Sequence, residues 1–127
     1  MDGRPEKPLF FMGSSQDDLR EFPEDVKDEV GYALYRVQLG LTPRSAKPLK
    51  GYGGATVVEI SEDYQTDTYR AVYTVRFAGV VYVLHVFQKK SRRGRETPQA
   101  DLKLIRRRLA QAEEHYRGWL QTQEQRG

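Results

Sequence analysis

Apolar and polar positions between residues 69 and 95 predict two paired strands. The first strand alternates, with one face formed by Tyr69, Ala71, Tyr73, Val75 and Phe77. The second strand, residues 80–87, is apolar at nearly every position, as is typical of a strand covered on both faces. A turn at Ala78-Gly79 joins them. Arg70 and Arg76 fall on the other face of the first strand. Because an unpaired buried guanidinium costs free energy, we expect that face to be a shallow working surface.

Helical periodicity predicts two helices before these strands and one after them. A short helix within residues 14–22 buries Leu19 and Phe22. A second helix begins at Pro23, ends at Gly40, and has a buried stripe of Val26, Val30, Ala33, Leu34 and Val37. The last helix covers residues 97–119 and has a stripe of Leu102, Ile105, Leu109, Ala112 and Tyr116.

The remaining segments complete an α+β fold. Residues 8–12 and 56–60 are predicted strands, residues 61–67 a polar turn, and residues 41–55 a long loop rich in proline and glycine. The order is therefore β-α-α-β-β-β-α. We expect a curved, mainly antiparallel four-stranded sheet that carries a helical hairpin on one face, with the other face partly open, and a C-terminal helix.

Length and composition indicate a single soluble domain. We place the domain at residues 8–119, after a disordered lead of residues 1–7 and before a flexible tail of residues 120–127. Hydrophobic residues make up 38% and charged residues 31% of the chain. No apolar run approaches the roughly 20 residues of a membrane helix, and the N-terminus lacks the apolar segment of a signal peptide. The absence of cysteine excludes disulfides and a cysteine nucleophile, and it fits a cytoplasmic protein.

The charge is unevenly distributed along the chain. The net charge is +3, but residues 1–40 hold nine acidic and five basic side chains, whereas residues 85–108 hold nine basic and two acidic ones. A pole this basic, next to a strand with outward arginines, suggests a polyanionic partner such as nucleic acid. The alternative is a solvated charged face.

Candidate proton-transfer groups are few. His85 is the only histidine in the predicted sheet and could act in acid–base chemistry, although a lone histidine in an apolar strand is more often a hydrogen-bonded core residue. Glu59 could act as a base or hold Arg70 in place. His85 and His115 lie too far apart in the sequence to form a metal motif, and no nucleotide-binding or metalloprotease motif is present. We therefore expect neither a metal nor a cofactor.

The long loop of residues 41–55 offers groups that could bind RNA. Lys47 and Lys50 could contact phosphates, and Tyr52 could stack on a base. The alternative is a surface connection in which Leu49 fills a gap in the core.

Three segments together resemble a known family: KPLKGYGGATVVEI, DTYRAVYTVRFAGVVYVLHVFQKKS and TPQADLKLIRRRLAQA. In their order and spacing, over about residues 8–117, the chain resembles the RelE/HigB-type toxins of toxin–antitoxin systems, and it looks closest to the phage-derived HigB-like branch. The resemblance implies a RelE-like fold and a metal-free endonuclease that cuts mRNA in the ribosomal A site. It implies attack of a ribose 2′-hydroxyl on the adjacent phosphate. The implied partner is a helix-turn-helix antitoxin, with the toxin a monomer or part of a toxin–antitoxin hetero-oligomer.

The resemblance also assigns roles to residues. It places a catalytic arginine at Arg70, followed by basic residues matched by Lys89 and Lys90. A guanidinium fork suits a phosphate with developing charge, although Arg70 could instead form an ion pair with Glu59. Further RNA-binding candidates are Arg76, which lies peripherally, and Arg92, Arg93 and Arg95.

Two other functions remain compatible with this sequence. The ParE-like toxins share the fold and inhibit DNA gyrase without cutting nucleic acid. A non-catalytic, phage-derived RNA-binding module would also explain the basic pole. Growth arrest with intact mRNA would favour the first, and RNA binding without toxicity would favour the second.

Overall fold

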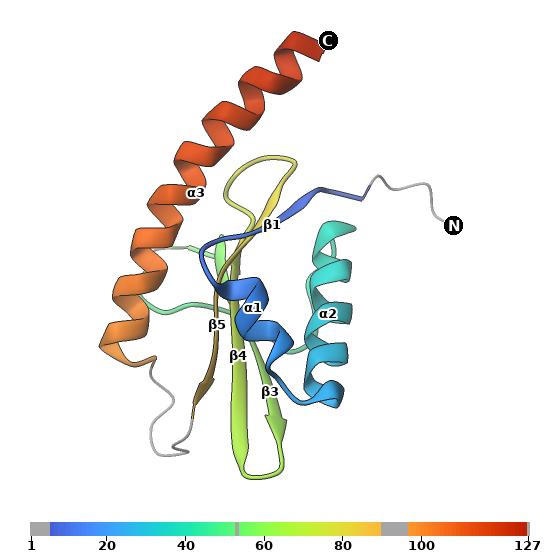
Figure 1. The fold of residues 1–127 in the computed structure, drawn as a ribbon, viewed down its shortest axis with the longest axis vertical. Helices are drawn as coiled ribbons and strands as arrows, with labels where there is room; N and C mark the ends of the chain where they lie inside the picture. Colours follow the sequence, from blue (N-terminus) through green and yellow to red (C-terminus); the bar gives the residue numbers. More distant parts are fainter. Residues whose placement is uncertain (1–5, 53, 90–96, 127) are drawn as a thin grey trace.

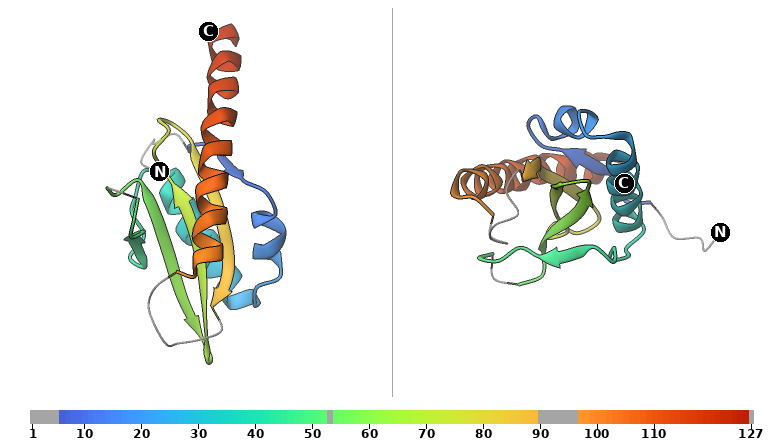
Figure 2. Two further views of the ribbon diagram at one scale, coloured as in Figure 1. Left: turned by 90° about the vertical axis from the view of Figure 1, so that its left-hand side faces the viewer. Right: turned by 90° about the horizontal axis from the view of Figure 1, so that it is seen from below.

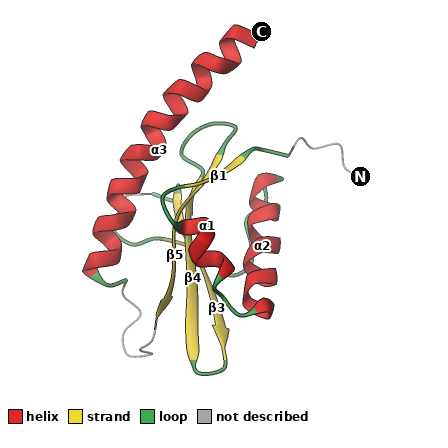
Figure 3. Ribbon diagram, viewed as in Figure 1, coloured by secondary structure: helices red, strands yellow, loops and turns green. Residues whose placement is uncertain are grey.

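A computed structural model describes residues 6–52, 54–89 and 97–126 (Figure 1). The elements in chain order are β1 (Leu9–Phe11), α1 (Ser15–Arg20), α2 (Glu24–Gln38), β2 (Ala46–Pro48), β3 (Val57–Tyr64), β4 (Asp67–Thr74), β5 (Val81–Lys89) and α3 (Gln99–Arg126). The α+β class and the predicted order are confirmed, with one strand more than expected (Figure 3). No helix in the described part of the chain combines the length and apolar character that a bilayer span requires.

The sheet has five strands in the order β1-β5-β4-β3-β2. β1 runs parallel to β5, and the other neighbours are antiparallel. β2 corrects two expectations, because it adds a fifth strand and lies inside the segment that we expected to be a loop. It pairs only three residues with β3 at the sheet edge, where a proline such as Pro48 is tolerated. So short a strand has too little pattern to be recognised from the sequence.

β3 is longer than predicted. It continues to Tyr64, so residues 61–67 are not a polar turn. The turn is instead tight and centres on Gln65, whose φ of 56° is the only positive value at a non-glycine residue among the described residues. Ser61, Glu62 and Asp63 are consecutive polar residues of which none is buried, and such a run looks like a turn when the chain is read alone.

The predicted helical hairpin packs on one face of the sheet, as Figure 2 shows. Every residue of the predicted α2 stripe is buried. The first hydrophobic core joins this stripe and Leu19 and Phe22 of the α1 segment to the strand residues Val58, Ile60, Tyr69, Ala71, Tyr73, Val81, Val83 and Val86.

The other face of the sheet carries α3, so it is not the shallow surface that we expected, although Phe87 and Lys89 at its end are only half-buried. Helix α3 crosses it and builds a second core, in which Ile105 and Ala112 are fully buried (Figures 1 and 2). Val72, next to Arg70 in this face, is also fully buried. Phe77 joins this second core rather than the first, because β4 ends at Thr74 and the strand alternation ends with it.

Helix α3 is longer than predicted. It continues to Arg126, so the segment expected to be a flexible tail is helical, and Figure 1 shows it projecting beyond the sheet. Its last buried residue is Ala112. The segment after Trp119 consists mainly of glutamine, glutamate and arginine, which are good helix formers, and neither glycine nor proline interrupts it before Gly127.

Candidate functional site

A β-bulge decides which side chains of β5 share a face with Arg70. His85 lies opposite Val72, but Val83 lies opposite Tyr73, so Leu84 is an extra residue in β5. Before the bulge, the odd-numbered residues Val81 and Val83 face the first core. After the bulge, the even-numbered Val86 faces that core, and the odd-numbered residues face the second core. The bulge therefore directs His85, Phe87 and Lys89 toward α3.

Side chains from four strands consequently meet on one face. Lys47 lies opposite Glu59, which lies opposite Val72, which in turn lies opposite His85. One row further along, Arg70 lies opposite Phe87, and beyond it Thr68 lies opposite Lys89. Because directly opposite residues share a face, this register brings together predicted residues from separate parts of the sequence. We call this set the sheet-face site: Lys47, Glu59, Arg70, His85, Phe87 and Lys89.

Arg70 and Glu59 form a buried ion pair at the centre of the sheet-face site. Arg70 Nη1 lies 3.2 Å from Glu59 Oε2, and the two side chains are only 8% and 13% exposed. Glu59 also accepts hydrogen bonds from the hydroxyls of Ser61 and Thr97, each at 3.3 Å. The ion pair that we considered as an alternative role for Arg70 is thus present, and it holds the guanidinium in one orientation.

His85 is a hydrogen-bonded core histidine. Its Nε2 lies 2.7 Å from Asp101 Oδ1, and its ring stacks on Phe87 with a centroid distance of 4.6 Å. Sequence reasoning missed Asp101, which looked like an ordinary acidic residue in the first helical turn. It precedes Ile105 by four positions and therefore begins the buried stripe of α3, the one signal that could have identified it.

Arg108 is a second residue that sequence reasoning missed. It is 8% exposed and donates hydrogen bonds to the Leu84 carbonyl at 3.0 Å and to Ser14 Oγ at 3.2 Å. A third contact reaches His85 Nδ1 at 3.4 Å. Burial lowers the pKa of Arg108, and the nearby carboxylate of Asp18 opposes this shift. Arg108 therefore connects α3 by hydrogen bonds to Leu84 in the bulge and to Ser14, the residue before α1.

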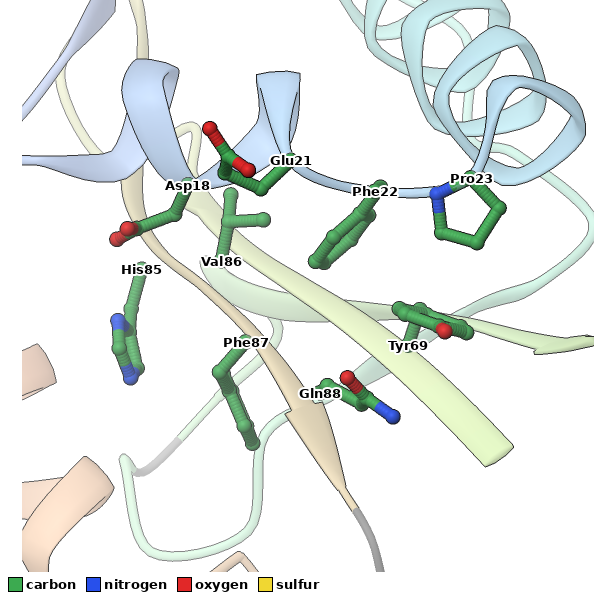
Figure 4. Close-up of a pocket in the computed structure, with 9 residues that line it drawn as sticks. All are labelled: Asp18, Glu21, Phe22, Pro23, Tyr69, His85, Val86, Phe87 and Gln88. Carbon is green, nitrogen blue, oxygen red and sulfur yellow. The ribbon is translucent and has the colours of Figure 1, made fainter. Parts of the chain in front are cut away.

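A pocket of about 570 Å³ lies beside His85, between α1 and β5 (Figure 4). In Figure 4 the carboxylate of Asp18 lies on the same side of β5 as the His85 and Phe87 rings. The residues that line the pocket are Asp18, Glu21, Phe22, Pro23, Tyr69, His85, Val86, Phe87 and Gln88. The pocket therefore offers aromatic faces and carboxylates next to the sheet-face site.

The structure does not place the other predicted RNA-binding residues in the sheet-face site. Tyr52 packs against the second core and donates its hydroxyl hydrogen to the Leu102 carbonyl at 3.2 Å, and burial raises its pKa. Leu49 is buried, in agreement with the alternative considered for this loop. Lys50 is exposed in the loop before β3, and Arg76 is exposed beyond the far end of β4.

Several predicted residues lie outside the described residues: Lys90, Arg92, Arg93 and Arg95. Within the described ranges, no group of three or more histidine, aspartate or glutamate side chains could hold a metal ion.

Comparisons with known proteins give a family and a fold. Residues 17–110 match the family described as "Phage derived protein Gp49-like (DUF891)". A double arginine-to-alanine mutant of the E. coli toxin RelE, solved in the free state, is 21% identical with a TM-score of 0.50; the match covers 64% of this chain and 81% of that one. A chain of the Mycobacterium tuberculosis toxin–antitoxin complex RelBE2 is 21% identical with a TM-score of 0.46, over 72% of this chain and 100% of that one. No curated protein matches significantly. The likeness to RelE shows that the fold is RelE-like.

Proposed function

The chain belongs to the phage-derived Gp49-like family, and on this premise we propose that it is the toxin of a toxin–antitoxin pair. Its activity would be ribosome-dependent cleavage of mRNA in the cytoplasm, and its partner a helix-turn-helix antitoxin. The RelE-like fold and the earlier resemblance to RelE/HigB toxins support this proposal.

One observation carries the proposal: a buried arginine is held by a carboxylate on a sheet face that also carries lysines. Arg70 is oriented by Glu59, and the register puts Lys47 and Lys89 on the same face. Cleavage by a ribose 2′-hydroxyl builds negative charge on the phosphate, and a fixed guanidinium stabilises such charge without having to reorganise. Arg70 would bind the reacting phosphate, and Lys89 would protonate the leaving 5′-oxygen.

The remaining predicted residues would support RNA binding or proton transfer. Lys90 and His85 stay candidates for the chemistry, and the RNA-binding candidates are Lys47, Lys50, Tyr52, Arg76, Arg92, Arg93 and Arg95. Glu59 would position Arg70, because both of its carboxylate oxygens already accept hydrogen bonds.

Primer extension on a reporter mRNA after brief induction tests the proposal. We expect cuts that appear only while the message is translated and that are lost in Arg70→Ala. Because this variant leaves Glu59 buried without its cation, Arg70→Met/Glu59→Gln serves as a charge-free companion that should fold and still not cut. Arg117→Ala, which removes an exposed arginine of α3 that is not a candidate for RNA binding, is the matched control and should cut like the wild type.

Two other results would contradict the proposal. Growth arrest with an intact message and DNA damage signals would indicate a ParE-like gyrase inhibitor. RNA binding without cleavage or toxicity would indicate a non-catalytic module.

A further inference from the structure

We propose that Asp101 is the general base that accepts the 2′-hydroxyl proton, and that His85 is the residue that positions it. This inference rests on the proposed function. Two carboxylates contact residues of the sheet-face site, Glu59 on Arg70 and Asp101 on His85, and they differ in how many of their oxygens are occupied. Oε1 of Glu59 accepts a hydrogen bond from Ser61, and its Oε2 accepts two, from Arg70 and Thr97. A carboxylate held in this way is a poor proton acceptor.

Asp101 is the less occupied carboxylate. Its Oδ1 is engaged by His85 at 2.7 Å, while its Oδ2 has no hydrogen-bond partner among the described residues. Its side chain is 26% exposed, twice the exposure of Glu59. Asp101 therefore combines a fixed orientation with one oxygen that a substrate hydroxyl can reach.

Two chains of contacts place Asp101 beside Arg70. Thr97 donates to Glu59, the partner of Arg70, and Asp101 follows four residues later, in the first turn of α3. From the other side, Arg70 lies opposite Phe87, whose ring stacks on His85. A phosphate bound by Arg70 would thus lie on the same side of the sheet as the Asp101 carboxylate.

His85 is better suited to position Asp101 than to transfer the proton itself. The Arg108 guanidinium can only donate, so its contact with Nδ1 makes that nitrogen an acceptor. The ring proton of neutral His85 then lies on Nε2 and is donated to Asp101. Both ring nitrogens are occupied, and the residue is 7% exposed. The charged groups that act on Arg108 are Asp18 of α1 and Arg107 of α3, and Glu21 lines the pocket beside His85.

The proposed step is balanced in protons and bonds. Asp101 takes the 2′-hydroxyl proton, the 2′-oxygen forms a bond to phosphorus, and the bond from phosphorus to the 5′-oxygen breaks. Lys89 gives a proton to the leaving 5′-oxygen. The products are a 2′,3′-cyclic phosphate and a 5′-hydroxyl, and solvent returns the two residues to their starting protonation states.

Single-turnover cleavage of ribosome-bound mRNA by the purified protein tests this inference. We expect Asp101→Asn to cut at least 100-fold more slowly, within the range of general acid–base catalysis, with an unchanged fold by circular dichroism. Asp101→Glu should recover part of the rate. His85→Gln, which retains a hydrogen-bond donor, should lose about tenfold, less than the full acid–base contribution. Glu113→Gln, the same kind of change at an exposed position of the same helix, is the control and should match the wild type.

The pH profile separates a base from a structural contact. Because a protonated carboxyl cannot accept the proton, the wild-type rate should fall tenfold per pH unit at its acid limb, and this limb should be absent in Asp101→Asn. If the wild type cuts, and Asp101→Asn cuts at the same rate or with the same pH profile, the role of Asp101 is wrong while the proposed function stands. A folded wild type that does not cut would overturn the proposed function and the inference with it.

Discussion

The buried Arg70–Glu59 pair predicts a specific pattern of stability in a double-mutant cycle. The perturbations are Arg70→Met, Glu59→Gln and the combination of both. Each single variant leaves one buried group without its charged partner, whereas the double variant leaves two neutral groups of similar size. We therefore expect the double variant to be more stable than the sum of the single losses predicts.

The magnitude follows from the geometry of the pair. At the observed 3.2 Å and an effective dielectric constant of about 20, the attraction between the two charges is about 5 kcal/mol. Desolvation of two charges offsets much of this energy, but removing one partner does not restore the solvation of the other. Each single variant should therefore lose about 3 kcal/mol of unfolding free energy, and the coupling between the two should be about 2 kcal/mol.

Urea unfolding followed by the fluorescence of Trp119 measures all four proteins, with thermal melts as a second probe. A loss of about 3 kcal/mol corresponds to a fall in Tm of about 12 °C for a chain of this size. Arg76→Met supplies the matched control, because that arginine is exposed, and its unfolding free energy should change by less than about 0.5 kcal/mol. Strictly additive losses in the cycle would refute the reasoning, since they would mean that the pair contributes no interaction energy.

Three further predictions follow from the described structure. Gly13 has a φ of 55°, and a Cβ there would lie 2.6 Å from Arg108 Nε. Gly13→Ala should therefore lower the unfolding free energy by about 2 kcal/mol. Gly31→Ala, where a Cβ would meet open space, should not lower it. Burial raises the pKa of Tyr82 to about 12; a raised pKa gives stability that is complete below pH 10 and is lost as the pH rises toward 12, and Tyr82→Phe should reduce this alkaline loss in unfolding titrations. Removal of residues 121–127 should change stability by less than about 1 kcal/mol in urea, because Ala112 is the last buried residue of α3, and a larger loss would mean that the helix end has an unseen contact.

The sequence was most informative where one helix or strand face is buried continuously. The α2 stripe from Val26 to Val37 could be predicted residue by residue, because five apolar positions recur at helical spacing. The apolar run of β5 likewise predicted a strand covered on both faces. β2 and the end of α3 could not be predicted, because three residues at a sheet edge and an exposed, mainly polar helix end leave no hydrophobic pattern.

Which of the candidate residues lie together was predictable only in part, for a different reason. Arg70, Glu59 and Lys89 could be named, but their common face depends on the extra residue Leu84 in the bulge, and strand parity alone places His85 incorrectly. The importance of Arg108 was hidden in a run of three arginines. Only its position between Ile105 and Ala112 on the helix shows that it belongs to the buried side.

The sheet-face site is proposed to cut mRNA on the ribosome. The most direct test incubates the purified protein with one mRNA, either free or bound to ribosomes with an occupied P site, and identifies the new ends. We expect cleavage only of the ribosome-bound message, with a 2′,3′-cyclic phosphate upstream and a 5′-hydroxyl downstream, and no cleavage by Arg70→Met/Glu59→Gln. An intact message on ribosomes, or the same cleavage by this folded variant, would contradict the proposal.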